Sequence, residues 1–452
     1  MFYRNLFVAS AFYLGLAKAE QASNFDVSVE VAEQYGCDQV CQQTLAAANI
    51  ADLKTFGTDF DFDFYATAQN FSSSQPGDVL KFKPMNSTTI DVSPGTSVFK
   101  MQYTSEDLDG SPVPVTAMIA FPYAKNEQPF DVVAWAHGTS GGYRGCAPST
   151  SPSLYEFSTA WSALIHQGYA VVATDYAGLG NNYTEHKYMS NAAHANDVVY
   201  SVIAAKKAFA QYLSNNWVSI GHSQGGSAVW KLSEHKLVQD TSSGYLGGVA
   251  MAPAGTRIID TLEIGVRKMQ NATDSRVYNM LPGAAAGVLA IQRVFPDYEP
   301  TLLSSATLQR LKLSNVTQAC VIGMSALVMT LPVTGILNDT DLSHDTYMQK
   351  FQELNGAALG ASASKPLLVV HGEEDTIIPY EANKAAWKDS CSYGNPVQLS
   401  LYPGLDHSSL LFGASPEWLG FIADRFANAA FNESCTQSEA QPFNLQYAKS
   451  PN

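Results

Sequence analysis

The stretch "WVSIGHSQGGSAVWKLSEHK" (residues 217–236) joins a short β-rich run to a helical pattern through a turn of small residues. It predicts a strand, then Ser223 on a tight strand-to-helix turn, then a helix. Gly-x-Ser-x-Gly alone is a weak signal, because chance produces it in roughly one chain in six of this length. The context strengthens it: a serine in such a turn is strained and crowded, and Gly221, Gly225 and Gly226 provide the small neighbours it needs. We interpret Ser223 as a nucleophile.

Similar β-rich runs alternate with helical stretches along most of the chain. Such continuous apolar strands, separated by helices, predict an α/β fold with a mostly parallel sheet and helices on both faces. Residues 96–122 predict two strands around Asp109-Gly110, an antiparallel hairpin at one edge. The parallel runs span residues 130–138, 169–180, 217–226, 246–255, 365–375 and 397–407.

About a hundred residues between the runs at 246–255 and 365–371 break this rhythm. They are mostly helical and Ala-rich, and we expect a helical cap over the carboxyl edge of the sheet, where open α/β sheets bind ligands. The predicted organisation is a signal peptide (1–19), a helical arm (20–56), a first core part (57–254), an inserted cap (255–360), and a second core part with a tail (361–452).

The first nineteen residues, "MFYRNLFVASAFYLGLAKA", carry Arg4, an apolar run and the small-x-small end Ala17-Lys18-Ala19. This pattern predicts a cleaved secretory signal, and the apolar run is too short to span a bilayer. We expect a secreted, extracellular protein without a stable membrane anchor, making at most transient contact with a lipid interface. A net charge of −15 argues against a nucleic-acid partner.

Secretion determines how the six cysteines are interpreted. An even number in an oxidising compartment predicts up to three disulfides with fifteen pairings open. A metal site is disfavoured, because only Cys37 and Cys41 are close in sequence and no histidine lies near them. Sequons for N-glycosylation occur at Asn70, Asn86, Asn182, Asn271, Asn315, Asn338 and Asn432.

A serine hydroxyl needs a base, and the base needs an acid to orient it. His407 follows "VQLSLYPGLD" (397–406), where a parallel-sheet hydrolase would place its base. Asp375 ends "LLVVHGEED" and is our candidate acid, whereas Glu373 and Glu374 are expected to be solvated. We expect His371 to lie outside this triad, and the side chain of His222 to point away.

An oxyanion hole needs two backbone donors. The amide of Gln224, directly after the nucleophile, is one candidate. The other is predicted in the loop "AHGTSGG" after the run at 130–136, where we favour Thr139 and keep Gly138 as the alternative.

Five motifs, in the order in which they occur, resemble the secretory lipase family, the lipase A-type α/β-hydrolases of fungi and bacteria. They are "AHGTSGG…GCAPS", "VVATDYAGLG", "GHSQGG", "HGEEDTIIPY" and "YPGLDH". The resemblance covers about residues 60–430. It implies a secreted ester hydrolase without cofactor or metal, acting on an ester or lipid. It also implies the disulfides Cys146–Cys320 and Cys391–Cys435, which leaves Cys37–Cys41. Family members often have Gly-Gly after the nucleophile, where this chain has Gln224-Gly225, so the preferred substrate stays open.

Three alternatives remain at this point: an esterase or acyltransferase that tailors one metabolite, a serine exopeptidase of the same fold, and a binding module without activity. An exopeptidase needs buried acidic groups for the substrate amine, whereas the cap is rich in Ala, Leu and Val. We expect apolar cap side chains, among them Leu327 and Met329, to lie over Ser223 and to favour longer acyl chains.

Overall fold

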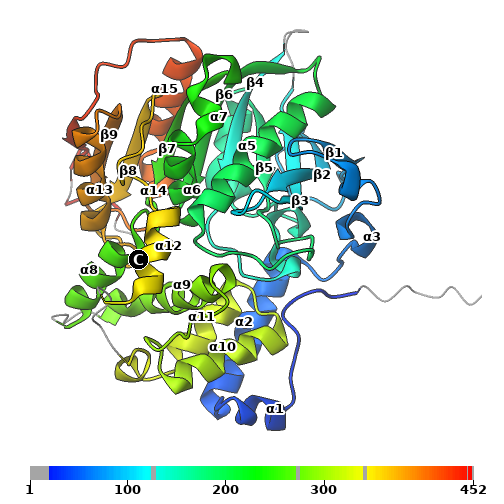
Figure 1. Cartoon of the computed structure of the whole chain (residues 1–452), viewed down its shortest axis with the longest axis vertical. Coiled ribbons are helices and arrows are strands. Elements are labelled where there is room, and N and C mark those ends of the chain that lie inside the picture. Colours follow the sequence, from blue (N-terminus) through cyan, green and yellow to red (C-terminus); the bar gives the residue numbers. More distant parts are fainter. Residues whose placement is uncertain (1–19, 124–128, 271–274, 339–343, 445, 450–452) are drawn as a thin grey trace, which may run out of the picture.

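The computed structural model describes residues 20–123, 129–270, 275–338, 344–444 and 446–449; the predicted signal peptide and Asn271 lie outside them. A ten-stranded sheet runs through the molecule in the order β1-β2-β3-β5-β4-β6-β7-β8-β9-β10 (Figure 1). From β5 to β10 neighbouring strands pair in parallel, and β1, β2 and β3 form an antiparallel edge. The mostly parallel α/β sheet predicted from the sequence is confirmed. The strands are β1 (Val79–Pro84), β2 (Ser97–Glu106), β3 (Pro112–Phe121), β4 (Phe130–Ala136), β5 (Ala170–Thr174), β6 (Leu213–His222), β7 (Tyr245–Met251), β8 (Leu367–Gly372), β9 (Val397–Tyr402) and β10 (Gln437–Glu439).

Two edge strands were not predicted. β1, "VLKFKP", is short, contains two lysines and ends in proline, which are features of an edge strand that faces water. β10 has three exposed polar or charged residues and pairs only with β9. Apolar and charged residues alternate from Leu80 to Lys83 of β1, a strand signal that our prediction missed. β10 has no apolar residue, so only its pairing in the folded chain reveals it.

The sheet is buried on both faces, which explains the continuous apolar runs. In β4, Val132 and Ala134 face one hydrophobic core, while Val133 and Trp135 face the other, as the two-residue period of a strand requires. One face is covered by α5 (Asn191–Ala208), α6 (Gln224–Ser233) and α13 (Tyr380–Ser392), and the other by α4 (Ser162–His166), α14 (Leu410–Gly413) and α15 (Ser415–Phe426). Two short helices pack elsewhere: α7 (Lys236–Gln239) adds Val238 to the core under α5 and α6, and α3 (Phe62–Tyr65) adds Phe64 and Tyr65 to a small separate cluster.

A separate group of helices lies at one end of the sheet (Figure 1). It comprises α8 (Ile258–Gln270), α9 (Leu281–Val294), α10 (Ser305–Thr317), α11 (Val321–Met329) and α12 (Thr346–Asn355), and we call it the cap. The cap has a hydrophobic core of its own, which includes Leu262, Ala285, Ile291 and Phe351. Part of its apolar sequence therefore stabilises the cap itself.

The N-terminal arm packs on the cap. Its helices α1 (Val29–Gln34) and α2 (Gln39–Phe56) lie beside the cap helices in Figure 1, and α2 contacts α11. Leu327 of α11 is fully buried in the cluster that contains Cys41 and Leu45 of the arm. Met329 is 45% exposed. The expectation that these two residues lie over Ser223 is therefore wrong, because the arm covers the side of α11 from which Leu327 projects.

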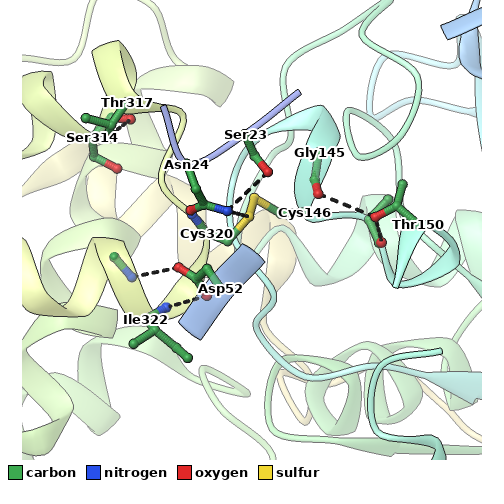
Figure 2. Close-up of a disulfide and its surroundings, with 12 residues drawn as sticks. Ser23, Asn24, Asp52, Gly145, Cys146, Thr150, Ser314, Thr317, Cys320 and Ile322 are labelled. Atoms are coloured by element: carbon green, nitrogen blue, oxygen red, sulfur yellow. Dashed lines mark hydrogen bonds between the residues drawn. A yellow bond between two sulfur atoms is a disulfide. The ribbon is translucent and has the colours of Figure 1, made fainter. Parts of the chain in front are cut away.

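Three disulfides cross-link the chain: Cys37–Cys41, Cys146–Cys320 and Cys391–Cys435. The second joins residues 174 positions apart and links the loop after β4 to the N-terminus of α11 (Figure 2). Within the described residues no helix is long and apolar enough to cross a membrane. The six described sequon asparagines are all exposed.

Candidate active site

Ser223 lies on the turn between β6 and α6, with a positive φ of 56° that non-glycine residues rarely adopt. The turn is packed so tightly that its glycines cannot be replaced. A Cβ on Gly225 would lie 1.9 Å from the carbonyl oxygen of Ala136, and one on Gly221 would lie 2.3 Å from that of Gly225. This close packing holds Ser223 at the end of β6, on the wall of a cavity, in the geometry expected of a nucleophile elbow.

His407 and Asp375 come together from two loops at the same end of the sheet. Nδ1 of His407 lies 2.7 Å from Oδ2 of Asp375. The other carboxylate oxygen of Asp375 accepts hydrogen bonds from the amides of Ile377 and Ile378, both at 2.8 Å. Burial raises the pKa of Asp375, but His407 and His371 outweigh it and hold the pKa well below its usual range. The ionised carboxylate keeps the proton of His407 on Nδ1 and leaves Nε2 to accept another.

His371 has a role that the sequence did not reveal. Asn383 donates to its Nδ1, so its proton lies on Nε2, 3.1 Å from Oδ2 of Asp375. His371 is thus outside the cavity, and it helps to hold the carboxylate of Asp375 in place. The spacing of four residues between His371 and Asp375 was the only signal in the sequence.

Two backbone amides are available near Ser223 as oxyanion donors. Among the described residues, the amides of Gln224 and Thr139 have no hydrogen-bond acceptor. The amide of Gly138, the alternative kept open above, donates to Oε2 of Glu156 at 3.0 Å. Tyr155 fixes the same loop by donating from its hydroxyl to the carbonyl of Thr139 at 2.6 Å. Of the two candidate amides in this loop, that of Gly138 is engaged, and that of Thr139 has no acceptor among the described residues.

His222 does not point away from the site, contrary to our expectation. Its ring packs against that of His407 with centroids 4.7 Å apart, and both rings line the cavity beside Ser223. The ring is drawn there by Glu156, whose Oε1 lies 3.1 Å from Nδ1 of His222. Sequence reasoning missed Glu156 because it lies in an irregular segment that no motif marks.

A cavity of about 330 Å³ lies between the sheet and the cap, and Ser223 and His407 lie on its wall. The core contributes Thr139, Tyr155, Tyr188 and Met189. The cap contributes mostly apolar or small side chains: Ile258, Leu262, Met280, Pro282, Gly283, Ala284, Gly287, Val321 and Met324. Neither Leu327 nor Met329 is among the lining residues. The face of α11 toward the site is the one that carries Val321, Met324 and Ser325.

The cap is fixed directly to the loop that follows β4 (residues 137–142), which carries the candidate donor Thr139 and which we call the oxyanion loop. The amide of Val321 donates to the carbonyl of Ser140 at 3.0 Å, next to the Cys146–Cys320 disulfide. Asp52 of the arm accepts hydrogen bonds from the amides of Ile322 and Gly323 at the start of α11 (Figure 2). The arm, the cap and the oxyanion loop therefore meet at one point. No group of three His, Cys, Asp or Glu side chains that could hold a metal occurs among the described residues.

The comparisons with known proteins agree with this geometry. The family model described as "Secretory lipase" matches residues 153–433, more than half of the chain. A secreted triacylglycerol lipase of Malassezia globosa is 24% identical over 413 residues, which cover 83% of this chain and 81% of that protein. Lipase A of Moesziomyces aphidis is 25% identical over 425 residues, with 84% and 86% covered.

Solved structures share the fold. The closed state of Candida antarctica lipase A superposes with a TM-score of 0.64 at 18% identity, covering 84% of this chain and 89% of that one. The cell-wall-degrading esterase LipA of Xanthomonas oryzae superposes with a TM-score of 0.61 at 18% identity, covering 78% and 98%. With the family matched over most of the core, the chain belongs to the secretory lipase family and is a carboxylic ester hydrolase of the α/β-hydrolase fold.

Proposed function

We propose that this protein is a secreted lipase or carboxylesterase that works through an acyl-enzyme on Ser223. The observation that carries the proposal is the meeting of an elbow serine and a paired His407–Asp375 at the wall of one apolar cavity. In this reaction His407 takes the proton of Ser223 as the hydroxyl attacks the ester carbonyl. The amides of Gln224 and Thr139 stabilise the oxyanion, and His407 then protonates the leaving alcohol.

The second half of the reaction hydrolyses the acyl-enzyme and regenerates the free enzyme. Water enters in place of the alcohol, His407 removes its proton, and the resulting hydroxide attacks the acyl-enzyme. Breakdown of the second tetrahedral intermediate releases the carboxylic acid and restores the hydroxyl of Ser223. The apolar cap wall supports an acyl chain as the occupant of the cavity, and a water-insoluble lipid ester as the substrate class.

The exopeptidase alternative finds little support. Glu156 is the acidic side chain on the cavity wall, and both of its oxygens already accept hydrogen bonds, from Gly138 and His222. It is therefore not free to hold a substrate amine. The nineteen-residue leader and the exposed sequons support secretion and glycosylation of the mature chain.

The test is hydrolysis of p-nitrophenyl esters by the secreted protein, beside the variant Ser223→Ala. We expect the wild type to hydrolyse the esters and to be labelled by a fluorophosphonate at Ser223. The variant should lose both properties, with kcat lower by about a millionfold, as removal of a catalytic serine produces elsewhere. Labelling at another serine, or hydrolysis by Ser223→Ala, would contradict the proposal.

A further inference from the structure

Glu156 and His222 form a second carboxylate–imidazole pair beside Ser223, and the reaction above assigns no step to it. Their side chains are 11% and 7% exposed, and both line the cavity. A buried charge is unfavourable unless it is paired and hydrogen-bonded, and removing one partner leaves the other uncompensated. A pair in this place therefore needs an explanation.

The pair connects three segments that are far apart in the sequence. Oε2 of Glu156 accepts the amide of Gly138 in the oxyanion loop at 3.0 Å. Oε1 faces Nδ1 of His222 in the elbow, and Nε2 of His222 donates to the backbone carbonyl of His407 at 3.0 Å. One chain of hydrogen bonds thus runs from the oxyanion loop through the elbow to the loop of the base.

The hydrogen-bond partners hold both side chains of the pair in place. The atoms that face the two ring nitrogens of His222 are a carboxylate oxygen of Glu156 and the carbonyl oxygen of His407, and Glu156 also accepts from the amide of Gly138. Burial raises the pKa of Glu156, but the hydrogen bond and charge of His222 and the amide of Gly138 outweigh burial and hold this pKa below its usual value.

The backbone at Glu156 is also unusual. Its φ is 60°, in the left-handed region that is uncommon for a residue with a Cβ. Its neighbour Tyr155 donates to the carbonyl of Thr139 at 2.6 Å. These two consecutive residues hold Gly138 by its amide and Thr139 by its carbonyl, and they leave the amide of Thr139 free to donate.

We propose that Glu156 and His222 are positioning residues for ester hydrolysis. Glu156 holds Gly138 so that the amide of Thr139 faces the oxyanion, and His222 holds the backbone of His407 in place relative to Ser223. The inference rests on the proposed function, because it assumes that Ser223 and His407 react and that Thr139 is a donor.

The first experiment replaces Glu156 with its isostere. In Glu156→Gln the carbonyl oxygen can still accept from the amide of Gly138, but the NH2 group that replaces the second oxygen is a donor. It can therefore face Nδ1 of His222 only when that nitrogen carries no proton, and the negative charge of the pair is lost. We expect kcat for p-nitrophenyl butyrate to fall about a hundredfold, because displacements of about 1 Å have that effect. KM should stay within about twofold, since the shape of the cavity is kept. A purely structural role would lower the thermal midpoint without this split.

A double-mutant cycle tests whether the two residues act as one unit. His222→Gln retains an amide nitrogen near the position of Nε2, so the contact to the carbonyl of His407 can persist while the link to Glu156 is lost. This variant also serves if Glu156→Gln does not fold. We expect Glu156→Gln/His222→Gln to be no more than about twofold slower than the slower single variant. Additive losses would overturn the pairing.

Glu234→Gln is the matched control. Glu234 is also a buried glutamate, with its side chain 3% exposed, and it accepts the amide of Ala358 at 2.7 Å away from the cavity. This change should alter the thermal midpoint and leave kcat unchanged. If Glu156→Gln and His222→Gln keep wild-type kcat while Ser223→Ala is inactive, the inference on Glu156 and His222 fails alone. If Ser223→Ala is active, the proposed function fails instead.

Discussion

Met324 of α11 offers the sharpest test of how the cap selects substrates. Its side chain lines the cavity that holds Ser223 and His407, together with Val321 and Ser325 of the same helix, whereas Leu327 is buried against the arm. We expect Met324→Glu to discriminate against long acyl chains. A carboxylate in this wall keeps water beside it and prevents the neighbouring part of the chain from being buried.

The magnitude follows from the area removed from water. Each buried methylene contributes about 0.8 kcal/mol, so the six that distinguish an octanoyl from an acetyl chain contribute up to about 5 kcal/mol. If the new carboxylate keeps three of them from being buried, the loss is about 2.4 kcal/mol, or roughly sixtyfold in kcat/KM. The acetyl ester, whose acyl group has no methylene to bury, should lose little.

The assay is kcat/KM for p-nitrophenyl acetate, butyrate and octanoate in monomeric solution, with the thermal midpoint of each variant as a check on folding. Met329→Glu is the control, because it makes the same change on the same helix at a residue that is 45% exposed and outside the cavity wall. Its ratio of octanoate to acetate activity should stay at the wild-type value. If folded Met324→Glu lost kcat/KM equally for all three esters, the reasoning would be refuted, and the cap would not select substrates by acyl-chain length.

Three further results are expected. Asp375→Asn should lower kcat about 10⁴-fold in steady-state assays, because an amide cannot hold His407 in the tautomer that accepts a proton on Nε2, and a variant with a tenth of wild-type activity would contradict this. Burial raises the pKa of Asp52 to about 6. Asp52 therefore binds its proton more tightly in the folded protein than in the unfolded chain. As the pH rises from about 4 to about 6, the free energy of unfolding of the wild type relative to Asp52→Asn should fall by up to about 3 kcal/mol in urea titrations. An increase over this range would contradict the raised pKa. Removing the Cys146–Cys320 bridge as a double serine variant should lower the free energy of unfolding by up to about 5 kcal/mol in the same titration, since the bridge closes a loop of 174 positions, and an unchanged midpoint would show that the bridge is not formed.

Much of the molecule follows from local sequence. Short apolar runs such as "VVAWA", which alternate with helical stretches, indicate strands buried on both faces, and parallel pairing of such strands brings their carboxyl ends to one edge. The sequence alone predicts three further features, because each depends on residue type at a fixed place in a β–α repeat. They are the glycines of the turn at Ser223, the chain order Ser223, Asp375, His407, and the helical insertion.

Only the tertiary structure determines which residues far apart in the sequence are in contact. Because the arm packs on one face of α11, Leu327 is buried under α2, and Met324 faces the cavity. Glu156 belongs to the site only because an irregular segment with a left-handed residue turns it toward His222 and Gly138. Periodicity and motifs describe residues that are neighbours along one helix or strand. Contacts between loops depend on the packing of the whole chain, so the local sequence does not predict them.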